Sequence, residues 1–592
     1  MKKFYIFVFI ISLWGLQVQA QIIGSAYLDA NNIRARFNNN GVNFWDLQSS
    51  SQFFVPANST QTSFFSQSLF MSGKDSSGTY RIAADFFGSA GFDFTPGPIC
   101  NVYDSLYDLT WKNIFVIRRS TIDSFINWQS NPSAYPGYQI PDEIQYWPAH
   151  GDISNGQALY LAPFKDVDCD GMYDPSSGDY PLIKGDKALW YVYNDDRSNH
   201  PESGGPKIGA EVHLMAYAYN CSPVFSNTIF IDYTIYKRTA GDLSDFRIGI
   251  FADMDLGYSL DDYVACDVKR GSFYTYNGTA VDGNGTPEAY GANPPAIGLT
   301  VLQGPYLAPD MMDNPTHTLD SLGNPIPACD YSINGTNFGD SIIDNERIGL
   351  VGFASYNYTS LPTFTPSAIR INNELHHRWG NGSRIFYGEN GDSLNGAYGP
   401  ACRFMYPELS DPCNWGLDGA TPYGPKLWTE ETAGNSAGDR KGYGIVGPTI
   451  LQGNTPQYNP VKLELAIVWA RDTFARSVPA LMSAIDTVRY YSLNNIHPCG
   501  GTFLAVDETK AKPTELEINL FPNPAHNQTQ ITFSHTFTGL LELFDLSGKR
   551  IETIHLRNST SYDLNLDNIQ AGLYFIRVSN GDFLKVKKLI KN

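Results

Sequence analysis

Several motifs that mark large enzyme classes are missing from this sequence. It has no His-Glu-x-x-His zinc-protease motif, no P-loop, no dinucleotide-binding glycine fingerprint after a strand and no protease-type cysteine signature. No Cys-x-x-Cys pair or Cys/His spacing indicates zinc. Basic residues are scarce as well, because 41 Lys and Arg stand against 60 Asp and Glu, a formal charge of −19. Since nucleic-acid phosphates are bound by basic surfaces, we expect no nucleic-acid partner.

Long apolar runs are also absent, except at the N-terminus. Lys2 and Lys3 precede an apolar stretch from Phe4 to Leu16, and Val18-Gln19-Ala20 follows as a small-residue cleavage pattern. This pattern predicts a signal peptide over residues 1–20, too short to span a bilayer. We expect no transmembrane segment in the mature chain, because no other stretch is long and apolar enough.

Aromatic residues and turn formers are abundant, with 36 Tyr, 35 Phe, 53 Gly and 36 Pro. Alternating apolar runs at 211–219, 228–236 and 246–251 are separated by short polar loops. Alternation with a period of two predicts strands with one buried face, and short loops favour antiparallel pairing. We therefore predict a mainly β fold of antiparallel β-sandwich domains. One helix is predicted to start near Ser477, where apolar residues recur at three- and four-residue steps.

The most specific motifs lie at the C-terminus. Alternating runs between turn residues indicate a small Ig-like β-sandwich there. The same segment contains Leu520–Pro524 with its Pro-Asn-Pro entry, Ala571–Tyr574 and the basic end Lys587–Lys591. Together these motifs resemble the type A C-terminal sorting domain of the type IX (Por) secretion system of Bacteroidetes. The resemblance implies that the outer-membrane translocon of that system recognises residues 514–592 and that the protein reaches the cell surface or the extracellular space.

These features give a provisional domain organisation. The order is a signal peptide at 1–20, an N-terminal β-rich domain at 21–165, a central β-rich domain with acidic loops at 166–505, a linker at 506–513 and the sorting domain at 514–592. Eight cysteines in an exported chain predict disulfides, and Cys402 and Cys413 are the easiest pair to close because a short loop separates them.

An acidic loop from 166 to 179 has the spacing of a calcium site. Carboxylates at alternate positions are followed by a glycine that permits a sharp turn, as a loop wrapped around a hard cation requires. The loop resembles EF-hand and dockerin-type loops, but its twelfth position is Ser177 and not a bidentate acid, so closure would have to come from Asp179 or from a distant residue. The expected ligands are Asp166, Asp168, Asp170, the carbonyl of Met172, Asp174 and Asp179. The alternative is an acidic surface turn, and bound calcium would favour a structural over a catalytic role.

A second acidic stretch lies between residues 253 and 267. It holds five carboxylates within fifteen residues, which repel one another unless a positive charge lies among them. A second cation bound by Asp253, Asp255 and Asp262 is one interpretation, and a solvated acidic loop is the other.

Residues 434–438 match the G-x-S-x-G pattern of serine hydrolases, but a nucleophile elbow needs a strand before it and a helix after it. Glycine-rich sequence follows instead, so we do not expect Ser436 to be a nucleophile. The sequence favours a calcium-stabilised, non-enzymatic adhesive or structural component with a surface glycan or matrix molecule as ligand. The alternative is a secreted hydrolase acting on polysaccharide, for which a deep cleft with two carboxylates roughly 5 to 9 Å apart would be evidence.

Overall fold

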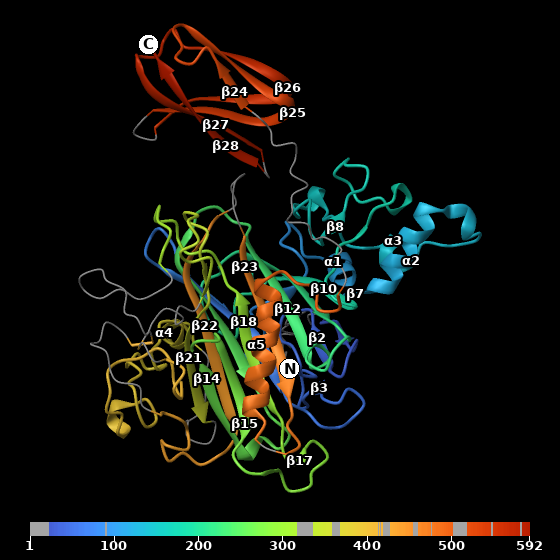
Figure 1. Ribbon diagram of the computed structural model, residues 1–592, viewed down its shortest axis with the longest axis vertical. Coiled ribbons are helices and arrows are strands. Elements are labelled where there is room, and N and C mark those ends of the chain that lie inside the picture. Colours follow the sequence, from blue (N-terminus) through green and yellow to red (C-terminus); the bar gives the residue numbers. More distant parts are fainter. Residues whose placement is uncertain are drawn as a thin grey trace, which may run out of the picture.

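The computed structural model describes residues 23–592 except 89–90, 316–334, 358–366, 412–413, 415, 418–426, 454–459, 475, 501–517, 546–548 and 581–582. The expected signal peptide and the linker at 506–513 lie outside the described residues. The described chain is mostly β and its main sheets are antiparallel, which confirms the predicted fold class (Figure 1). Among these residues no helix is long and apolar enough to cross a membrane.

The larger sheet of the described chain has nine antiparallel strands. The runs at 211–219 and 228–236 form two neighbouring strands of its interior, as their alternation predicts. In spatial order the strands are β14 (Asp262–Asp267), β15 (Ser272–Asn277), β18 (Ala296–Gln303), β23 (Val461–Ala470), β12 (Thr228–Lys237), β11 (Ala210–Ala218), β10 (Lys187–Asn194) and β6 (Thr95–Pro96), and β7 (Phe115–Arg118) also pairs with β10.

A second sheet packs against the inner face of the first to form a β-sandwich. Phe273 of the larger sheet stacks on Phe353 of the smaller one with ring centroids 5.1 Å apart. Between the sheets, the Tyr233 hydroxyl donates to the Gln67 side chain at 3.0 Å. The smaller sheet consists, in order, of β21 (Leu350–Asn357), β22 (Arg440–Leu451), β13 (Leu243–Asp253), β4 (Ser66–Lys74) and β5 (Tyr80–Ala84).

Two helices cover the outer faces of the sandwich. Helix α5 (Val478–Leu493) runs along β18 and β23 (Figure 1). Its side chains Leu481 and Ile485 are fully buried beneath it. Gly298 of β18 permits this close approach, because a Cβ there would lie 3.3 Å from the Ile485 Cδ1 atom. Helix α4 (Ala368–Leu375) contacts β4, β5 and β13 on the other side. The helix predicted near Ser477 is thus confirmed, whereas the other helices were not predicted from the sequence.

The remaining elements are smaller. Strands β1 (Ser25–Leu28), β2 (Arg34–Asn38) and β3 (Phe53–Phe54) form a three-stranded sheet. The two-stranded pairs are β8 (Phe164–Lys165) with β9 (Tyr180–Pro181), β16 (Val281–Asp282) with β17 (Gly291–Ala292), and β19 (Gly335–Thr336) with β20 (Arg347–Ile348). Helices α1 (Ser105–Trp111), α2 (Arg119–Ser130) and α3 (Asp142–Gln145) lie in the chain before β8.

The C-terminal segment folds around its own core. Strand β25 pairs with β24 in its first half and with β27 in its second half, so the segment is sandwich-like. Its buried side chains, among them Leu541, Ile576 and Leu589, form a cluster separate from the main core. The main core extends from Leu28 to Val488, on both sides of the boundary expected at 165/166. The strands are β24 (Ile518–Phe521), β25 (Gln528–Asp545), β26 (Arg550–Asn565), β27 (Gly572–Asn580) and β28 (Phe583–Lys591).

A buried histidine joins edge strand β5 to the loop after β10. His200 is fully buried, with Nδ1 2.7 Å from the Ile82 carbonyl and Nε2 2.9 Å from the Asp195 carbonyl. Burial alone would lower its pKa, but hydrogen bonding to Asp195 and the charges of Asp195 and Asp93 raise the pKa of His200 to about 9. The ring is therefore a protonated donor to both carbonyls.

We expect the free energy of unfolding to fall as the pH rises from about 6.5 to about 9. Folded His200 keeps its proton up to about pH 9, whereas an unfolded histidine releases it near pH 6.5. The protonated ring stabilises the folded state by on the order of 3 kcal/mol below the pKa of the unfolded histidine. This stabilisation is lost as the pH rises through the pKa of folded His200. Denaturant unfolding across this range measures the slope, which His200→Gln should flatten and His555→Gln, an exposed tail histidine, should not. An equal slope in the His200 variant would contradict the assignment.

Candidate metal centres

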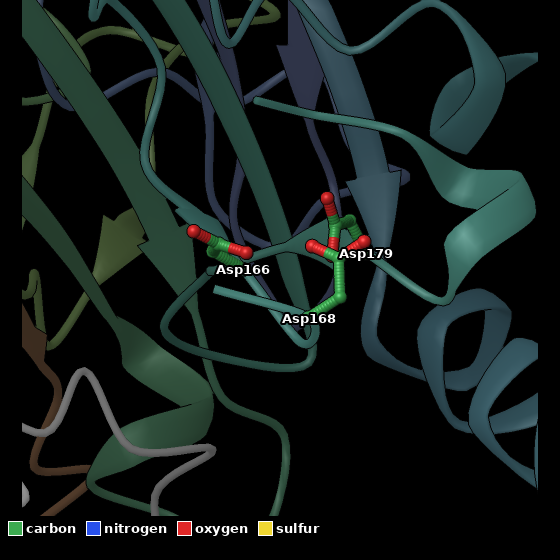
Figure 2. Close-up of side chains that lie close together, drawn as sticks. All are labelled: Asp166, Asp168 and Asp179. Atoms are coloured by element: carbon green, nitrogen blue, oxygen red, sulfur yellow. The ribbon is translucent and has the colours of Figure 1, made fainter. Parts of the chain in front are cut away.

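The loop from 166 to 179 is closed at its base by a short strand pair. Strands β8 and β9 pair so that Lys165 lies opposite Tyr180, which brings Asp166 and Asp179 to the same place. Oxygen atoms of Asp166, Asp168 and Asp179 all lie within 4.8 Å of one another (Figure 2). Asp179 is fully buried, whereas Asp168 is exposed. The strand pairing thus places Asp179, an acid beyond the twelfth position of the motif, where a closing ligand is needed.

Two of these carboxylates also organise the loop backbone. Asp166 accepts the N–H groups of Cys169 at 2.7 Å and Gly171 at 2.9 Å. Asp179 accepts the N–H groups of Val167 at 2.8 Å and Asp174 at 2.9 Å. Gly171 has a φ of 82°, the left-handed conformation expected of the glycine in this motif. Each carboxylate oxygen keeps a second lone pair for a cation.

The acids of the loop raise one another's proton affinity. Desolvation, followed by the charges of Asp170, Asp179 and Asp166, raises the pKa of Asp168. A cation among these groups would relieve the repulsion, so the donor set fits calcium.

Two of the other expected ligands have local roles in the turn. Asp170 accepts the Met172 N–H at 2.7 Å. Asp174 accepts the Ser176 N–H at 2.8 Å and its hydroxyl at 2.6 Å, and thereby caps the turn at 175–177. Neither acid is in the converging group, and calcium binding by Asp170, Asp174 and the Met172 carbonyl stays a prediction.

A second group of acids forms where β13 meets β22. Asp253 ends β13, and Asp439 immediately precedes β22, in which Lys441 pairs with Asp253. Oxygen atoms of Asp253, Asp255 and Asp439 lie within 4.8 Å of one another. Asp262, expected here, instead accepts the Leu256 N–H at 3.0 Å and is not in the group. Sequence reasoning missed Asp439, because only strand pairing brings it to residues almost two hundred positions earlier.

This second group carries more negative charge than its protein partners balance. Lys441 Nζ lies 3.0 Å from Asp253 and 3.7 Å from Asp439. The Oδ1 atoms of Asp253, Asp255 and Asp439 are buried and have no hydrogen-bond partner among the described residues. Desolvation, which exceeds the effect of Lys441, raises the pKa of Asp253, and desolvation followed by the Asp253 charge raises that of Asp255. Three carboxylates beside one ammonium leave the charge that a divalent cation would balance.

The other candidate site residues do not assemble. A turn at 430–434 and an irregular segment at 435–439 lead into strand β22, with no helix after residues 434–438, so Ser436 lacks the context of a nucleophile elbow, as expected. Cys413 lies outside the described residues, so its predicted pairing with Cys402 is not described. The structure has a disulfide between Cys221 and Cys499.

Comparison with known families identifies the C-terminal segment. Residues 519–592 match the family described as a secretion system C-terminal sorting domain. This segment is a type IX sorting tail. The sorting tail directs the protein across the outer membrane to the cell surface or the extracellular space and is handled by the type IX machinery.

Comparisons over the rest of the chain are uninformative about activity. No curated protein matches the sequence. One matching solved structure is a polysaccharide lyase, with a TM-score of 0.17 and 6% identity. The alignment covers 64% of this chain and only 34% of the lyase. A likeness of this size carries no conclusion about fold or function.

We expect calcium to raise the melting temperature and EDTA to lower it. Calcium at 100 times its dissociation constant adds about 3 kcal/mol to the free energy of unfolding of any protein that binds it only when folded. Differential scanning calorimetry measures the shift, which Asp168→Asn should reduce. Asp152→Asn is the matched control, because Asp152 caps a similar turn but lies outside both acid groups. A melting temperature unchanged by EDTA would contradict calcium binding.

We expect two calcium ions per chain. Equilibrium dialysis should give two ions for the wild type, one for Asp168→Asn and one for Asp439→Asn, since each variant removes a carboxylate from one group only. Asp262→Asn should still bind two. If Asp439→Asn keeps both ions and Asp262→Asn loses one, the second site is built as the sequence suggests and not as the strand pairing indicates.

Proposed function

We propose that this protein is a calcium-stabilised, non-enzymatic adhesive or structural component that the type IX system delivers to the cell surface or beyond. The observation that carries the proposal is the position of the acid groups. Each lies where strands end or pair, and the first holds its own loop through backbone N–H groups. A cation there would fix loops and strand ends. The arrangement therefore supports a structural metal more than a catalytic one.

A second candidate function is the hydrolysis of polysaccharide, and one specific observation favours it. Asp232 of β12 and Glu464 of β23 are directly opposite each other on the outer face of the nine-stranded sheet. Lys184 Nζ lies 2.8 Å from Asp232 Oδ2 and 3.6 Å from Glu464 Oε1. These two carboxylate oxygen atoms can therefore be no further apart than the sum of the two distances. Desolvation, which outweighs the attraction of Lys184, raises the pKa of Asp232 to about 6. A glycosidase uses two such carboxylates.

The shared lysine argues for a binding role. An acid that transfers a proton to a glycosidic oxygen must be protonated and must face the substrate, whereas here both carboxylates point to one ammonium group. Lys184 itself is held strongly in its charged form, because these acids overcome the desolvation that would lower its pKa. Non-enzymatic binding is therefore the preferred function.

Removal of residues 514–592 should leave the protein in the periplasm, because the sorting tail is the element that the translocon recognises. The tail has its own core, so its removal should leave the sandwich intact. Cell fractionation with immunoblotting of periplasm, cell surface and medium measures the distribution. Asp168→Asn with an intact tail is the control and should be exported. Appearance of the truncated chain outside the cell would contradict the assigned route.

We expect the mature chain with calcium to retain polysaccharide without cleaving it. Incubation with a panel of polysaccharides, scored together for retention and for newly formed reducing ends, measures both activities. Retention without new reducing ends is the result expected of the adhesive function. Release of reducing ends that Asp232→Asn abolishes would establish the hydrolase instead.

A further inference from the structure

A groove of about 670 Å³ lies on the outer face of the nine-stranded sheet, beside helix α5. Because side chains alternate along strands, every second residue of β10, β11, β12 and β23 points toward this face. One row crosses five neighbouring strands in register, from Trp190 through Met215, Asp232 and Glu464 to Gln303. Four strand spacings of about 4.8 Å give the row a length of roughly 19 Å. All five side chains line the groove.

The walls of the groove are fixed. On one side, Tyr491 of α5 packs on Phe225 with ring centroids 5.1 Å apart. The chain after α5 is held by the disulfide between Cys499 and Cys221, which lies just beyond the end of β11. Leu161 and Pro163, which precede β8, also line the groove. The groove is therefore pre-formed, as ligand sites usually are, and its volume is within their usual range of about 300–1,000 Å³.

We propose that this groove is the ligand site of the protein and that it takes a segment of a neutral polysaccharide laid across the strands. The inference rests on the proposed function, since it names the place and the ligand class of the adhesive activity. The lining combines aromatic rings with charged groups. Tyr217 and Phe230 form a parallel stack with centroids 5.1 Å apart, and the Lys184–Asp232–Glu464 cluster lies on the next row of the same face.

This combination suits a sugar chain better than other ligands. A sugar ring presents apolar C–H faces to aromatic side chains and hydroxyls that both donate to carboxylates and accept from ammonium groups. A lipid would exclude water from the three charged groups of the cluster and offer them no hydrogen bonds of its own, at high cost. An extended peptide gains most of its affinity at a sheet edge, whereas the backbone groups of β11, β12 and β23 are already paired on both sides.

The charges favour a neutral polymer over an anionic one. The charged side chains that line the groove nearly balance, since Asp232 and Glu464 stand against Lys184, Lys462 and Arg347. Lys184 is already engaged by the two carboxylates. The lining therefore presents no strong positive field that would attract uronates or sulfates. The nearby guanidinium of Arg347 donates to Gln303 and to the Gly304 carbonyl, at 2.7 and 2.8 Å, and thereby positions the last member of the row. At longer range, the charge of −19 disfavours the approach of a polyanion.

Affinity electrophoresis of the full mature chain with calcium tests the site. The probes are soluble neutral glucans, xylans and mannans, with polygalacturonate as the anionic comparison. Asp232→Asn and Tyr491→Ala should each weaken binding of the retained neutral polymer about tenfold, because each removes one contact of the groove. Tyr490→Ala is the matched control, since Tyr490 precedes Tyr491 on α5 but is exposed and does not line the groove. Circular dichroism and melting temperatures establish that the variants fold.

The outcomes distinguish a failure of the groove assignment from a failure of the proposed function. Loss of binding in both groove variants, with the control unchanged, supports the site. Retention by all variants at wild-type affinity overturns the groove and leaves the adhesive function in place. Retention of polygalacturonate alone overturns the neutral ligand class. If the wild type retains no polysaccharide, the proposed glycan ligand fails and the groove assignment fails with it.

Discussion

The packing of the nine-stranded sheet against the five-stranded sheet is the interaction on which the other features depend. The inner faces bury an almost continuous layer of aromatic and branched side chains, including the stacked Phe273 and Phe353. Each square ångström of apolar surface removed from water contributes about 25 cal/mol, so this layer is the main stabilising term. Because it fixes the inner face of every strand, it also fixes which residues point outward and which strand ends come together. The acid groups and the groove follow from that arrangement.

The acid groups show how strand pairing concentrates charge. Asp253 and Asp439 belong to neighbouring strands, and the sandwich holds them together although both carry negative charge. Lys441 is the cation that opposes that charge in the group, and the buried Oδ1 atoms of Asp253, Asp255 and Asp439 have no hydrogen-bond partner in the described structure. A fold that gathers acids at strand ends gains from a divalent cation, since the cation replaces repulsion by coordination. In a protein bound for the cell exterior, such a cation would stiffen loops without taking part in chemistry.

The outer face of the larger sheet has a different environment. Helix α5 covers β18 and β23, while the face over β10, β11 and β12 remains hollow and keeps charged groups within an aromatic surface. Charged residues in the middle of interior strands are costly unless they are paired, and the contacts of Lys184 with Asp232 and Glu464 supply that pairing. The disulfide at the end of α5 holds one wall, in keeping with an oxidising destination. The features of this face are those of a preorganised binding surface.

The sequence by itself determined the properties that depend on local patterns. Period-two alternation predicted β11, β12 and β13, three- and four-residue spacing predicted α5, and the motifs from Leu520 to Lys591 identified the sorting tail. The spacing of Asp166 and Asp168, with Asp179 beyond them, also predicted the group that converges in the first loop. Tertiary structure alone decided that Asp439, and not Asp262, joins Asp253 and Asp255 in the second acid group. It also decided that Lys184, Asp232 and Glu464 meet in a groove. A charged residue within the apolar runs of β12 and β23 was a visible signal, but it named no partner. The physical reason is that alternation and turns are set by neighbours along the chain, whereas these groups are set by pairing between strands that the sequence separates by up to about 230 residues.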